Sequence, residues 1–112
     1  MLPGADRAVL DPSKILGYLL DLEHPVGRGK ARLFRSLGFT RERWWLLADA
    51  LLQHASQHPV HATRRNPFGL KYIVRGTFHG TLGRSVHLES VWIVLDGEDA
   101  PRFVTAYPHT QA

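Results

Sequence analysis

The spacing of hydrophobic residues along the chain changes near residue 60. Before that point apolar residues recur at helical intervals, which predicts three helices. After it apolar and polar residues alternate, which is typical of half-exposed strands. Because helices precede strands instead of alternating with them, the pattern predicts an α+β fold. About three N-terminal helices would pack on a C-terminal antiparallel sheet of three to four strands, in a single domain spanning 1–112.

Cap residues set the limits of the predicted helices. Asp11 is a good N-cap and Pro12 suits the first helical position. Gly38 has the character of a glycine just beyond a helix end, and Thr40 is a candidate N-cap for the next helix. The predicted helices cover 11–24, 30–37 and 40–57, the first and third ending where a His-Pro pair follows.

The second half of the chain predicts a meander of strands separated by turns. The predicted strands cover 60–65, 70–78, 84–95 and 102–107, the first being short and the weakest. In the last strand, strict alternation would place Phe103, Thr105 and Tyr107 together on one face.

Basic residues are concentrated in the middle of the chain. The formal net charge is +4, yet the segment 28–75 alone holds ten Lys and Arg against two acidic residues, a net of +8. This asymmetry favours a polyanionic or acidic partner, although a solvated basic face with no partner remains open.

Cysteine and long apolar runs are both lacking in the sequence. Without Cys, neither a disulfide nor a thiolate site or nucleophile is possible. No apolar run approaches the ~20 residues of a membrane span. The first eleven residues lack the basic and apolar regions of a signal peptide, so we expect a cytoplasmic protein that does not contact a membrane.

Motifs for metal or nucleotide chemistry are weak. His54 and His58 lie one helical turn apart, but Ala55 stands where a zinc protease would carry its glutamate. No G-x-S-x-G, P-loop or G-x-G-x-x-G motif is present. We therefore expect no cofactor and no metal.

Cationic, hydroxyl and imidazole side chains are plentiful around the predicted sheet. The set is Lys30, Arg75, Arg84, Arg102, Thr105 and Tyr107, with His54, His79 and His87 as titratable candidates. Such groups suit metal-independent RNA cleavage, in which the RNA supplies its own 2′-OH nucleophile and the protein moves protons and neutralises phosphate charge. Ordinary strand-surface charges are the alternative. The Trp residues at 44, 45 and 92 fit a core better than a base-stacking platform.

Three stretches carry a family resemblance: 14–20, 24–39 with its Lys30-Ala31-x-x-Phe34 pattern, and 91–108 with Thr105-Ala106-Tyr107-Pro108. Together they resemble the bacterial domain of unknown function 6883 family over nearly the whole chain. Members occur alone and at the C-termini of large secreted polymorphic toxins. Their order of elements resembles the barnase/EndoU/colicin/RelE ribonuclease toxins, which is an analogy at the level of fold.

The resemblance implies a ribonuclease toxin, acting on RNA and held by a cognate antitoxin or immunity protein. The family's recurring polar positions fall on Lys30, His54, Arg84 and Thr105, which become the candidate catalytic residues. Lys30 and Arg84 would hold the phosphate, His54 would transfer a proton and Thr105 would orient the substrate. The alternative is a non-enzymatic binding module, either antitoxin-like, immunity-like or an adaptor.

Overall fold

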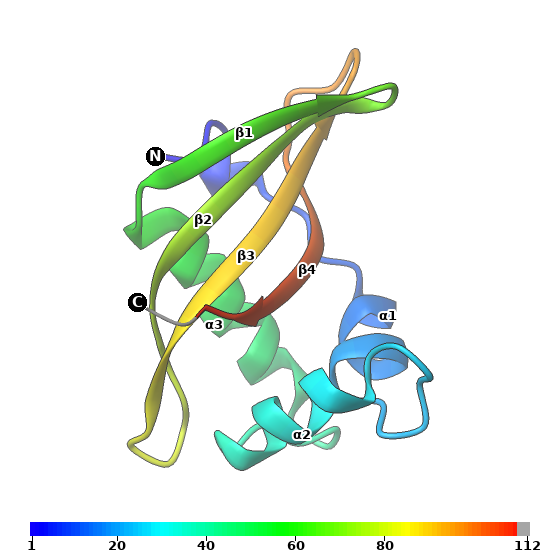
Figure 1. Cartoon of the computed structure of the whole chain (residues 1–112), viewed down its shortest axis with the longest axis vertical. Coiled ribbons are helices and arrows are strands. Elements are labelled where there is room, and N and C mark those ends of the chain that lie inside the picture. Colours follow the sequence, from blue (N-terminus) through cyan, green and yellow to red (C-terminus); the bar gives the residue numbers. More distant parts are fainter. Residues whose placement is uncertain (110–112) are drawn as a thin grey trace.

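Three helical segments and a four-stranded antiparallel sheet make up the computed structural model, which describes residues 1–109 (Figure 1). The α+β prediction, with helices preceding the sheet, is confirmed. The strands are β1 (Val60–Asn66), β2 (Gly69–His79), β3 (Ser85–Leu95) and β4 (Arg102–Pro108), paired in the order β1-β2-β3-β4. None of the helices in this described part of the chain is long and apolar enough to cross a membrane.

The first predicted helix is shorter than its hydrophobic pattern implies. Asp11 caps α1 (Pro12–Lys14) as expected, accepting the Ser13 amide at 2.9 Å. The chain then widens into a π-helical turn, η2 (Ile15–Leu19), in which the Leu20 amide donates to the Ile15 carbonyl, and the helix ends at Leu20. The helix ends early because Asp21 and His24 each accept backbone amides of the residues after them, which favours turns over helix.

The second helix, α2 (Arg28–Ser36), ends as the sequence predicts. Gly38 adopts a φ of 99°, and the Phe39 amide donates to the Phe34 carbonyl at 3.1 Å, closing a Schellman motif. The third helix, α3 (Trp44–Gln57), begins later than expected. Thr40 closes only a preceding turn by accepting the Arg43 amide at 3.3 Å, so the N-cap is Arg43.

The hydrophobic core lies between α3 and one face of the sheet. Trp92 and Phe78 are almost fully buried there, packed against apolar residues of η2, α2 and α3. Among the three Trp residues, Trp92 is core and Trp45 is 47% exposed. The other sheet face, called the outer face below, is crossed by no helix of the described chain (Figure 1).

A β-bulge in β4 changes which of its side chains face the core. Phe103 pairs with Trp92, but the next pair along β3 is Val91 with Thr105, so Val104 is an extra residue. Phe103 is therefore buried in the core, while Thr105 and Tyr107 share the outer face. The sequence-based assignment of all three to one face was wrong, because strict alternation does not allow for an inserted residue.

Candidate functional site

Lys30 and Thr105, two of the four residues expected to act together, meet at the ring of Tyr18. The Tyr18 and Thr105 hydroxyls are 3.0 Å apart, and the Lys30 ammonium lies 5.5 Å from the centre of the Tyr18 ring. This contact joins η2, the first turns of α2 and the edge strand β4. Helix and strand halves of the chain therefore contribute to one place, as the sequence-based hypothesis requires for these two residues.

An open hollow of about 670 Å³ lies beside this contact, and we call it the Tyr18 hollow. Its lining residues are Ser13, Lys14, Gly17, Tyr18, His24, Val104 and Thr105. The Lys14 ammonium is 5.8 Å from the Tyr18 ring centre, and the His24 ring meets Tyr18 edge-on at 5.2 Å. The lining contains three hydroxyl groups, an imidazole and an ammonium group but no carboxylate, so it suits an anion.

The charge around Tyr18 also changes its acidity. Partial burial raises the pKa of Tyr18, but the hydrogen bond with Thr105, the Lys30 ammonium and the Lys14 charge together outweigh burial. The resulting pKa lies below the usual 10.0, which makes the phenol a better proton donor than an ordinary tyrosine.

His54 lies elsewhere, inside the core between α3 and the sheet. Its side chain is only 3% exposed, with Nδ1 2.9 Å from the Ser90 hydroxyl and Nε2 3.2 Å from the Gly76 carbonyl. Burial lowers the pKa of His54 below 6.5 and outweighs the hydrogen bond to Gly76. Both ring nitrogens are thus engaged within the core, and His54 is not brought to the Tyr18 hollow.

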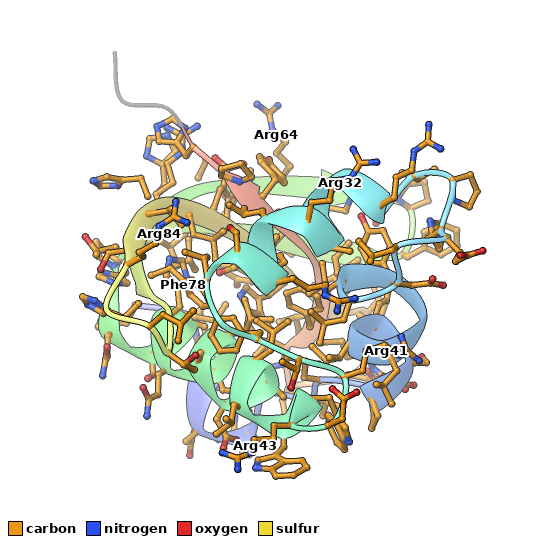
Figure 2. All side chains as sticks on the ribbon, turned by 90° about the horizontal axis from the view of Figure 1, so that it is seen from below. Arg32, Arg41, Arg43, Arg64, Phe78 and Arg84 are labelled. Atoms are coloured by element: carbon orange, nitrogen blue, oxygen red, sulfur yellow. The ribbon has the colours of Figure 1, made fainter. Side chains whose placement is uncertain are left out.

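Arg84 lies in the loop between β2 and β3, at the end of the sheet nearest α2. Its guanidinium donates to the Ser36 carbonyl at 3.4 Å, where α2 ends. Figure 2 places Arg84 on the same side of the molecule as Arg32 and Arg64, and Arg43 on the α3 side. Arg84 therefore flanks the outer-face side of the molecule, with no contact to Lys30 or Thr105 among the hydrogen bonds and ion pairs of the described residues.

The histidines of α3 do not form a metal centre. Nε2 of His58, the residue that follows α3, donates to the Thr77 carbonyl at 2.9 Å, and the His58 ring lies 4.9 Å from that of His54. Within residues 1–109, no group of three His, Cys, Asp or Glu side chains is arranged to hold an ion.

A second polar cluster, not anticipated from the sequence as a unit, occupies the outer face of the sheet. Glu89 on β3 has a side chain only 5% exposed, and Arg75 of β2 donates to it at 2.5 Å. The Tyr107 hydroxyl of β4 donates to the other carboxylate oxygen. Arg75 also lies 2.7 Å from Nε2 of His61. We call these four residues the Glu89 cluster.

Glu89 is the one acidic residue within the four strands. A buried carboxylate is stable only when its oxygens are paired and hydrogen-bonded, and both partners here come from neighbouring strands. The predicted hairpin loop, 79–83, is centred on residue 81 and would have placed Arg75 opposite His87. The observed loop, 80–84, is centred on Leu82, and antiparallel pairing about that centre places Arg75 directly opposite Glu89.

The Tyr18 hollow and the Glu89 cluster adjoin along β4. Thr105 pairs with Val91 and Tyr107 pairs with Glu89 without any irregularity between them, so both side chains occupy the same face. Residues two apart on a strand are separated by about 7 Å. An anion held at the Tyr18 hollow would therefore lie one strand step from the buried carboxylate.

Comparisons with known proteins were made by family, sequence and structure. The family model described as "Domain of unknown function (DUF6883)" matches residues 1–110. No curated protein matched by sequence. A chain from a contact-dependent growth inhibition toxin–immunity protein complex of Klebsiella pneumoniae 342 superposes with a TM-score of 0.72 and 20% identity, covering 96% of this chain and 98% of that one. At that identity the likeness shows a shared fold. The family match extends over nearly the whole sequence, and the chain belongs to the DUF6883 family.

Proposed function

We propose that this chain cleaves RNA without a metal ion, on the outer face between the Tyr18 hollow and the Glu89 cluster. The observation that carries the proposal is the hydrogen bond from Tyr107 to the buried carboxylate of Glu89, one strand step from Thr105. It places a proton acceptor beside an anion-binding hollow, and metal-independent cleavage of RNA requires that combination.

The proposed reaction is an internal transfer at phosphorus. The 2′-oxygen of the RNA forms a bond to phosphorus while the bond to the 5′-oxygen of the next nucleotide breaks. The products are a 2′,3′-cyclic phosphate and a free 5′-hydroxyl, so the 2′-OH proton must leave and the 5′-oxygen must gain one. One acceptor and one donor on opposite sides of the phosphate satisfy this balance.

Glu89 and Tyr18 take these two roles in the proposal. Glu89 accepts the 2′-OH proton through the Tyr107 hydroxyl, which passes its own proton to the carboxylate. Arg75 holds the Glu89 carboxylate in position through its hydrogen bond. The Tyr18 phenol, whose pKa is lowered by Thr105 and the nearby lysines, donates to the leaving 5′-oxygen.

Lys30 and Thr105 keep the roles that the sequence-based hypothesis gave them. The Lys30 ammonium neutralises the charge that develops on the phosphate, and the Thr105 hydroxyl orients a phosphate oxygen. Arg84, at the flank of the same side, contacts the RNA backbone farther from the cut. His54 stabilises the core in this proposal, because both of its ring nitrogens are engaged there.

The solved structure with the same fold supports a setting in a toxin–immunity system, since it is a complex of a growth inhibition toxin with an immunity protein. We propose that the chain acts as the toxin and has a cognate immunity protein as partner. The rival is an immunity-like binding module with no activity of its own, and it predicts harmless expression.

The test is incubation of purified protein with total RNA in EDTA. We expect cleavage that leaves 2′,3′-cyclic phosphate ends, lost in Lys30→Ala and Glu89→Gln. Matched controls are Arg43→Ala, a cation on the α3 side of the molecule, and Glu98→Gln, a surface carboxylate paired with Arg102 at 2.9 Å. Folded wild-type protein that leaves varied RNAs intact, and whose expression does not slow growth, would refute the proposal and favour the rival.

A further inference from the structure

Two cations lie directly opposite each other on the outer face, away from the Glu89 cluster. Arg64 of β1 pairs with Lys71 of β2 in the regular part of the β1–β2 ladder. Opposed residues on adjacent antiparallel strands have Cβ atoms about 5 Å apart, and like charges in that position destabilise a sheet. A sequence selected only for stability would avoid this pair.

The other strand arginines each have a carboxylate partner. Arg65 contacts Asp96 at 3.1 Å, Arg75 contacts Glu89 at 2.5 Å and Arg102 contacts Glu98 at 2.9 Å. Neither Arg64 nor Lys71 takes part in a salt bridge within residues 1–109. Figure 2 shows Arg64 projecting away from the body of the protein, on the side opposite α3. The pair is therefore an uncompensated positive site.

This pair shares a face with the proposed cleavage centre. Lys71 and Arg75 are four residues apart on β2, so their side chains point the same way and are separated by about 13 Å. Between them lies an apolar row formed by Ala62, Ile73 and Val91, which are paired across the three strands. The outer face thus presents a cationic row, an apolar row and then the Glu89 cluster.

We propose that Arg64 and Lys71 bind a phosphate of single-stranded RNA several nucleotides away from the cleaved bond. Unstacked bases would lie on the partly exposed end of this row, at Ala62 and Ile73, because Val91 is only 7% exposed. A duplex with its bases stacked inside could not use this surface. The identity of the ligand as RNA rests on the proposed function, whereas the positive site rests on the strand register alone. The substrate class is consequently single-stranded RNA longer than a dinucleotide.

The test compares Arg64→Ala/Lys71→Ala with Arg65→Ala, which removes a neighbouring arginine that is paired with Asp96. Binding of a short single-stranded RNA with methylated 2′-oxygens, which cannot be cleaved, is followed by fluorescence anisotropy at several salt concentrations. We expect the double variant to bind more weakly and to lose about 0.7 from the slope of log K against log salt, the value for one phosphate contact on a single strand. Arg65→Ala should retain the wild-type slope, and wild-type affinity and slope in the double variant would overturn the inference.

Cleavage assays separate this inference from the proposed function. The double variant should cut a dinucleotide as fast as wild type but show a raised KM for long RNA with little change in kcat. If wild type cuts RNA and the double variant has an unchanged KM for long RNA, the inference alone fails. If the wild-type protein cuts no RNA but the double variant still has a smaller slope of log K against log salt than wild type, the proposed cleavage fails and the phosphate site stands. If the double variant binds RNA as wild type does but no longer binds an acidic protein that wild type binds, the inference is overturned.

Discussion

Protonation of His54 should destabilise the folded protein as the pH falls through the weakly acidic range. The Gly76 carbonyl can only accept, so Nε2 of His54 carries the proton and Nδ1 accepts from the Ser90 hydroxyl. The Ser90 oxygen in turn accepts from the Trp92 indole at 3.0 Å. A second proton on the ring would face the Ser90 hydroxyl proton and break this buried chain.

The sign and size of the effect follow from the lowered pKa. Because the folded protein holds His54 below its unfolded pKa of about 6.5, the stabilisation is complete above pH 6.5 and is lost as the pH falls toward the folded value. The loss is at most about 1.4 kcal/mol per pH unit. At about 4 °C per kcal/mol for a domain of this size, the Tm should fall by up to about 6 °C per unit.

Thermal unfolding between pH 7.5 and 5.5 measures this effect, with His54→Gln as the key variant. Glutamine keeps a donor and an acceptor but has no proton to gain, so its Tm should vary less with pH while lying lower at pH 7.5. His79→Gln, at an exposed position in the hairpin, is the control and should retain the wild-type dependence. A curve of Tm against pH for His54→Gln that runs parallel to the wild-type curve would refute the reasoning. Loss of RNA cleavage in a folded His54→Gln protein would return His54 to the catalytic role that the sequence suggested.

Three further predictions concern residues in or near the proposed cleavage centre. A Cβ at Gly27 would lie 2.7 Å from both the Tyr18 ring and its carbonyl, so Gly27→Ala should destabilise the protein by about 1–3 kcal/mol and weaken RNA cleavage. Gly29→Ala, with no atom within 4 Å and a helical position, should instead stabilise it by about 0.5–1 kcal/mol by denaturant unfolding. Tyr107→Phe removes the hydroxyl on Glu89 and should reduce kcat about 10²–10⁴-fold at unchanged KM, and a variant with wild-type kcat would exclude the proton route through Tyr107.

The order of elements could be predicted from the sequence because it depends on local patterns. Gly38 and Asp11 perform the capping roles that their residue types indicate. The early end of the first helix could not be predicted, since the apolar spacing continues through Leu22 while the turn depends on side chains that bind their own backbone. Helical spacing records which face is buried, not where the backbone hydrogen bonds change partner.

The candidate site was predicted in part for a related reason. Lys30 and Thr105 were named from the sequence, but Tyr18, which joins them, was not among the candidate site residues. Tyrosine has an apolar ring and a polar end, and the pattern registers only the ring. Glu89 was passed over because a lone acid on a strand is usually a solvated charge, and its burial depends on partners from two other strands.

The bulge at Val104 links the fold to the proposed chemistry. With strict alternation along β4, Phe103 would share a face with Thr105 and Tyr107, so that either an aromatic core residue would be exposed or both hydroxyls would be buried. The extra residue lets Phe103 meet Trp92 in the core, with ring centres 5.2 Å apart, while Thr105 reaches Tyr18 and Tyr107 reaches Glu89. Bulges locally redirect side chains and are frequent beside active sites. The same inserted residue therefore satisfies the core and places a hydroxyl from β4 in each of the two clusters that the proposed reaction needs.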